Sequence, residues 1–189
     1  SRYGPAPGPR ADGAPPRFGW IGSRATLPYL AGIAGPLARA CAAAPGARLL
    51  AVADGDASLP GVPVDAEPWS DAGEADSLRR MDAGLMPLPD DPWTRGKCGF
   101  KLLQYGATGI PSIASPVGAN AAIVEDGRTG LLAADDAAWE AALLRLARDP
   151  DLRARLGAAA RRSVEERWST AVLGPTVARF VSQVAGARR

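Results

Sequence analysis

The sequence predicts a doubly wound α/β domain whose mainly parallel sheet has about six strands. Short apolar segments of strand length alternate with amphipathic segments of helix length along most of the chain. The connections between them are short, and this alternation favours parallel strands with helices on both faces of the sheet. At 189 residues, the chain fits a single domain with a proper hydrophobic core.

In the first half of the chain, apolar runs and turn signals define four strands and two helices. Phe18–Ile21 is a short apolar strand before a glycine turn. The helical periodicity from Leu27 to Ala44 ends at Pro45-Gly46, which is a helix stop signal. The other expected elements of this half are a buried strand at 47–54, a weaker strand at 61–64, a short helix at 76–81 and a strand at 83–87.

The second half continues the same alternation and ends in helices. Asp149 before Pro150 gives an N-cap with proline at the first helical position, so a helix should run from there to about Trp168. Ser169 should cap a final helix that packs away from the core of the sheet or crosses toward another domain. The other expected elements are a helix at 99–108, a strand at 110–114, a short helix at 119–124, a strand at Leu131 and a helix at 136–148.

Residues 1–17 are rich in proline and glycine and are expected to form a linker or a disordered arm. The globular domain is therefore expected to span 18–189. Because the chain opens with a linker and without an initiator methionine, we expect it to be part of a longer protein.

Composition excludes several classes of function. The net charge is +2, so charge alone indicates no nucleic-acid or membrane-surface partner, and no apolar run reaches the length of a membrane span. The chain has no histidine, which rules out Ser-His or Cys-His catalysis within it, and a zinc site is not expected. The two cysteines, Cys41 and Cys98, form no disulfide framework, which favours a reducing, cytoplasmic compartment.

The region from Arg95 to Asn120 is the main candidate for a binding site. It contains the only two lysines of the chain, Lys97 and Lys101, although the chain has 22 basic residues. Both lie where Gly99 and Phe100 open a helix, and cations are unfavourable at a helix N-terminus unless an anion joins them. The alternative is a surface turn with two solvated lysines. We predict a diphosphate site at this helix start.

Other loops offer weaker candidates. The turn Gly22-Ser23-Arg24 could present backbone N–H groups and a charge to the same phosphate, or could be an ordinary turn. Ser115–Asn120 could form another edge of the crevice, or a plain Pro-Gly turn. Trp69 could stack on a base, as could Trp93, although such residues more often fill gaps in loops.

Two further interpretations are disfavoured. Asp90-Asp91 suggests a metal only weakly, because adjacent carboxylates on a proline-rich turn are usually solvated. A dinucleotide-binding domain would explain Asp54 at the end of a strand. However, GWIGSRAT lacks the G-x-G-x-x-G pattern, and Asp54 lies farther on than that motif expects.

With these residues in view, the chain resembles the C-terminal, nucleotide-sugar-binding half of a GT-B glycosyltransferase of the large retaining group known as family 4 or group 1. RYGPAPGPR resembles the interdomain linker, FGWIGS the first strand and glycine loop, and Asp82–Ala133 the donor-binding core. The resemblance implies a Rossmann-like fold and a UDP- or GDP-type sugar donor held without a metal or other cofactor. It also implies an acceptor bound by an N-terminal domain that these residues do not contain. A fragment of this kind would be inactive alone, and any membrane attachment would be made through the absent domain.

The resemblance also assigns residues. The family carries a Glu-x7-Glu signature on the helix after the glycine loop, and this chain has Gly96 and Gln104 at those places. The resemblance implies that Gln104 contacts the ribose. It further implies that Gly22, Ser23, Gly99, Phe100 and Lys101 belong to the donor site, and that Lys97 and Arg24 serve the diphosphate. The alternative is a non-catalytic nucleotide-binding or scaffold module of the same fold.

Overall fold

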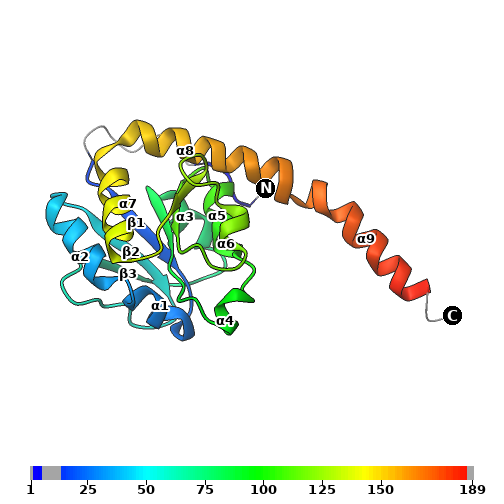
Figure 1. Cartoon of the computed structure of the whole chain (residues 1–189), viewed down its shortest axis with the longest axis horizontal. Helices are drawn as coiled ribbons and strands as arrows, with labels where there is room; N and C mark the ends of the chain where they lie inside the picture. Colours follow the sequence, from blue (N-terminus) through cyan, green and yellow to red (C-terminus); the bar gives the residue numbers. More distant parts are fainter. Residues whose placement is uncertain (1, 6–13, 187–189) are drawn as a thin grey trace.

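In a computed structural model, which describes residues 2–5 and 14–186, the described strands form one parallel sheet (Figure 1). The order across the sheet is β3-β2-β1-β4-β5-β6, and every paired neighbour is parallel. This confirms the predicted fold class. The strands are β1 (Arg17–Ile21), β2 (Arg48–Ala53), β3 (Val64–Pro68), β4 (Ala83–Met86), β5 (Ser112–Ala114) and β6 (Gly130–Leu132).

Helices cover both faces of the sheet. One core cluster packs α1, α2 and α7 against side chains such as Trp20 and Ile113. The other packs α3, α5 and α6 against the opposite face, where Ile21 and Met86 lie. The helical segments are η1 (Arg24–Thr26), α1 (Leu27–Ala31), α2 (Ala34–Ala43), α3 (Glu74–Arg79), α4 (Pro92–Arg95), α5 (Phe100–Ala107), α6 (Asn120–Ile123), α7 (Asp136–Arg148), α8 (Pro150–Ser163), the π-helix η2 (Val164–Trp168) and α9 (Thr170–Gly186).

The strand order places a topological switch point between β1 and β4. From β1 the chain moves outward through β2 to β3, and it then returns to β4 on the other side of β1. The connections after β1 and β4 therefore run in opposite directions and leave a crevice at the carboxyl ends of these two strands. The candidate site should lie there.

Two expected elements in the first half of the chain differ from the structure. The single helix expected over 27–44 is two helices, α1 and α2, because Pro36 has no N–H to bond to the carbonyl of Gly32 four residues earlier. The strand expected at 61–64 is β3, which begins at Val64 instead. β3 is a partly exposed strand at the edge of the sheet, so its sequence VDAEP contains polar residues. The strand therefore lacks the apolar run by which a buried strand is predicted.

The last helix, α9, leaves the body of the domain, whereas α8 packs on it (Figure 1). The expected helix over 150–168 ends at Ser163 and passes through η2 into α9. The described part of α9 contains no buried residue, and Figure 1 shows it pointing away from the sheet, as predicted. None of the helices that the structure describes combines the length and hydrophobicity needed to cross a bilayer.

Candidate anion-binding site

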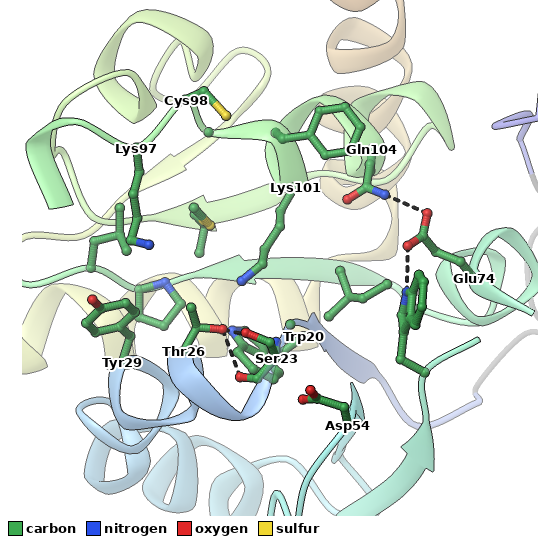
Figure 2. A pocket seen from close by; sticks show the side chains of 18 of the residues that line it. Trp20, Ser23, Thr26, Tyr29, Asp54, Glu74, Lys97, Cys98, Lys101 and Gln104 are labelled. Atoms are coloured by element: carbon green, nitrogen blue, oxygen red, sulfur yellow. Dashed lines mark hydrogen bonds between the residues drawn. The ribbon is translucent and has the colours of Figure 1, made fainter. Parts of the chain in front are cut away.

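A pocket of about 730 Å³ opens at the carboxyl ends of β1 and β4, where the switch point lies. Three segments contribute most of its wall: the turn after β1, the loop and helix start before α5, and the region around the start of α3 (Figure 2). The lining residues that bear on function are Trp20, Gly22, Ser23, Thr26, Tyr29, Asp54, Trp69, Glu74, Gly96, Lys97, Cys98, Gly99, Phe100, Lys101 and Gln104.

The start of α5 is fixed in position by Gly99. This residue is the N-cap and has a φ of 68°, in the left-handed region that favours glycine. A Cβ at this position would lie 2.6 Å from Cδ1 of Ile123, so a larger residue would displace that side chain. The turn directs the N-terminus of α5 and the side chain of Lys101 into the pocket (Figure 2).

Lys101 is a half-buried cation on the wall of the pocket. Its Nζ lies 4.7 Å from the centroid of the Trp20 ring. No ion pair links it to a carboxylate among the described residues. Burial and, second, the nearby charge of Lys97 lower the pKa of Lys101 from 10.5 to about 8. The protonated amine is therefore held in an unfavourable environment that a bound anion would relieve.

Lys97 comes from the same wall of the pocket as Lys101, and its side chain lies near aromatic rings. Its Nζ is 5.3 Å from the centroid of the Tyr29 ring (Figure 2) and 5.9 Å from that of the Trp93 ring. The structure thus brings the two lysines together in one pocket, as the sequence predicted.

The turn after β1 contributes less than its sequence suggested. Gly22 and Ser23 line the pocket, but their N–H groups are already used: Gly22 donates to the carbonyl of Val52 at 3.0 Å, and Ser23 donates to Oγ1 of Thr26 at 3.2 Å. The N–H of Arg24 donates to Asp54, and the Arg24 side chain does not line the pocket. Contact between Arg24 and a ligand stays a prediction.

A polar group that the sequence did not reveal closes one end of the pocket. Nε2 of Gln104 donates to Oε1 of Glu74 at 2.8 Å, and Nε1 of Trp69 donates to Oε2 of Glu74 at 2.7 Å (Figure 2). Tyr3 also contacts both Glu74 and Gln104 through its hydroxyl. Glu74 was missed because it lies 30 residues before Gln104 in a stretch that reads as a turn, and only the fold brings them together.

The remaining candidates have structural partners of their own. Asp90 pairs with Arg95 at 2.6 Å, and Asp91 caps α4 by accepting from the N–H of Thr94. Asn120 donates to the carbonyl of Ser115, which closes that loop outside the pocket. Within the described residues, no group of three or more acidic, cysteine or histidine side chains could hold a metal ion.

The fold and this pocket define a doubly wound α/β domain with a cationic crevice at its switch point. A family model described as glycosyl transferases group 1 matches residues 33–149. The chain therefore belongs to the group 1 glycosyl transferases, and the resemblance to this family is confirmed.

A relative in sequence is also a glycosyltransferase. The chain is 37% identical over 100 residues to D-inositol 3-phosphate glycosyltransferase of Streptomyces avermitilis, a match that covers 51% of this chain and 20% of that protein.

Solved structures share the fold. Sucrose-phosphate synthase of Thermosynechococcus elongatus superposes with a TM-score of 0.74 at 22% identity, over 92% of this chain and 46% of that one. The C-terminal domain of a group 1 glycosyl transferase from Francisella tularensis gives 0.66 at 17% identity, over 82% and 86%. The Anabaena protein HepE, in complex with UDP and glucose, gives 0.69 at 16% identity, over 90% and 49%. This chain thus spans less than half of two of these relatives.

Proposed function

We propose that this chain is the donor-binding domain of a retaining glycosyltransferase and that its pocket holds a nucleoside-diphosphate sugar, with UDP or GDP preferred to ADP. One observation carries the proposal. Lys101 is half-buried in a pocket at the switch point, without a carboxylate partner in the described structure. A desolvated cation of this kind is costly unless a ligand supplies the opposite charge.

The diphosphate would lie between the two lysines and the start of α5. The N-terminus of a helix attracts anions, and the left-handed turn at Gly99 starts α5 at the wall of this pocket. Gly22, Ser23 and Phe100 would border this position, since they line the same pocket. Arg24 would add charge from outside the wall.

The nucleoside would occupy the end of the pocket near α3. Gln104 lies there and would contact the ribose. The Trp69 ring is also part of this wall and remains 45% exposed, so a base could stack on it.

Glycosyl transfer would need an acceptor held by an N-terminal domain that is not among these residues, so we expect the 189-residue chain alone to be inactive as a transferase. The donor would bind without a metal ion, because two lysines would neutralise the diphosphate. We place the protein in the cytoplasm, where nucleotide sugars would reach it.

A non-catalytic nucleotide-binding module of the same fold is the second candidate. It is favoured by Gly96, which lines the pocket where the resemblance expects a glutamate that contacts the sugar. A domain that binds UDP equally well with and without an attached sugar would support this candidate.

Calorimetry of the chain with UDP, GDP and NAD, with and without a chelator, tests the proposal. Lys101→Ala should reduce UDP affinity about tenfold or more, because it removes a charge-assisted contact of roughly 1.5–3 kcal/mol. Arg179→Ala on the exposed helix α9 is the matched control and should change nothing. Binding of NAD alone, or UDP binding that ignores Lys101→Ala, would refute the site. The chelator should have no effect.

A further inference from the structure

Glu74 and Gln104 form a buried polar pair on the wall of the pocket, from two different helices, α3 and α5. Glu74 is 8% exposed and Gln104 is 5% exposed. Buried polar groups of this kind have defined hydrogen-bond partners. These partners determine which donor and acceptor atoms of the pair remain for a ligand.

The hydrogen bonds fix the orientation of the Gln104 amide. Its Nε2 donates to Oε1 of Glu74 at 2.8 Å and also lies 3.1 Å from the hydroxyl of Tyr3, so the NH₂ group faces these two oxygens. The reverse orientation would place two acceptor oxygens against each other. Oε1 of Gln104 therefore turns to the side away from Glu74, toward the pocket (Figure 2). Gln104 therefore offers this oxygen to a ligand as a hydrogen-bond acceptor.

The carboxylate of Glu74 is required for this arrangement. Oε1 accepts from Gln104 and from Tyr3, and Oε2 accepts from Nε1 of Trp69 at 2.7 Å. A glutamine at position 74 could accept through only one side-chain oxygen, so its NH₂ group would face one of these donors. Glu74 therefore anchors both the amide of Gln104 and the ring of Trp69.

We propose that Glu74 and Gln104 act as one unit that selects a hydroxyl-bearing ligand, here the ribose of the nucleotide. Gln104 presents Oε1 as the acceptor for a ribose hydroxyl, and Glu74 is the positioning residue that holds it in this orientation. This inference rests on the proposed function and adds the residue and the atoms that set its specificity.

The pair predicts an unusual response to substitution. Gln104→Glu is isosteric but places a second carboxylate against Glu74, so the two like charges repel. Glu74→Gln removes an acceptor that Gln104 or Trp69 needs. The double substitution Glu74→Gln/Gln104→Glu restores a complementary set: the new amide at position 74 can accept from Trp69 and donate to the new carboxylate at position 104. An acceptor would again face the pocket.

The test is a double-mutant cycle with two measurements. The first is the stability of the ligand-free chain in urea, and the second is the affinity for UDP, for 2′,3′-dideoxy-UDP and for inorganic pyrophosphate. Each single variant should be less stable than wild type and should bind UDP about tenfold more weakly, and the double variant should recover both properties. Wild type should prefer UDP to the dideoxy analogue about tenfold or more, because the analogue leaves Oε1 of Gln104 without a donor. Pyrophosphate affinity should vary much less than UDP affinity.

Charge-matched controls lie on exposed helical positions. Glu166→Gln and Gln183→Glu make the same chemical changes away from the pocket and should leave UDP binding unchanged. Additive effects in the cycle, with no recovery in the double variant, would overturn the pairing whether or not UDP binds. Equal affinity for UDP and the dideoxy analogue would overturn the hydroxyl role alone. A wild-type chain that binds no UDP would overturn the proposed function, and the hydroxyl role with it.

Discussion

Basic side chains have different surroundings at two places in this domain. At the β2–β3 edge of the sheet, arginines pair with carboxylates: Arg48 contacts Asp65 at 2.7 Å, and Arg80 contacts Glu67. In the pocket, Lys101 packs over an aromatic ring instead and has no carboxylate partner among the described residues. The edge charges are partly solvated and paired, whereas Lys101 is half-buried and faces no carboxylate in the described structure.

The difference separates charges that serve the fold from charges that serve a ligand. A partly exposed pair contributes little to stability and needs no further partner. A buried cation without a partner reduces stability, and a protein that retains one does so at a functional site more often than elsewhere. The next four predictions test this contrast, beginning with the largest expected effect.

Lys101→Met should stabilise the ligand-free chain while it weakens UDP binding. The pKa of Lys101 is lowered to about 8, so the protonated amine destabilises the folded state below that pH. An apolar side chain of similar length removes this cost, and we expect a gain of about 1–3 kcal/mol at pH 7. Urea denaturation measures it. A loss of stability would show that Lys101 serves the fold, as the edge arginines do.

UDP affinity should fall as the pH rises. Only the protonated form of Lys101 attracts the diphosphate, and its pKa of about 8 in the free chain lies within the accessible range. Calorimetry between pH 7.5 and 9 should show a loss of roughly five- to tenfold, by proton linkage. The free chain should instead gain stability above pH 8, because its unfolded state then binds more protons than its folded state. Lys101→Met should abolish both trends.

Lys97→Ala should have a smaller effect on UDP binding than a change at Lys101. Lys97 is partly exposed and lies against the rings of Tyr29 and Trp93, so solvent screens its charge. We expect a loss of about two- to fivefold, by the weakness of exposed charge contacts. The substitution also removes a neighbouring positive charge, which should raise the pKa of Lys101. A shift of the pH profile toward higher pH would report this coupling.

Arg80→Ala should have the smallest effect. The Arg80–Glu67 pair lies on an exposed edge, and its loss should cost about 0.2–1 kcal/mol of stability. Arg80 lowers the pKa of Glu67, so this contribution is present above the ordinary carboxyl range and is lost as the pH falls through the lowered pKa. Thermal unfolding at pH 7 and at pH 3 should show the difference shrinking in acid, with UDP affinity unchanged at pH 7.

Much of the fold could be predicted from local sequence patterns. The alternating elements and the parallel sheet were predicted from apolar runs such as that of β2 and from helix signals such as Asp149-Pro150. Such signals depend only on residues that are neighbours in the sequence. The errors have local causes as well. Pro36 divides the helix expected over 27–44, and the polar edge strand β3 lacks an apolar pattern.

The sequence by itself determined that two lysines flank the start of α5, because Gly99, Phe100 and the following helical periodicity fix that helix. Only the tertiary structure decided what surrounds them. It placed Lys101 over the ring of Trp20, and it brought Glu74 to Gln104 from a helix 30 residues earlier. Local patterns set the backbone of each segment, whereas desolvation and hydrogen-bond partners depend on segments that meet only after folding.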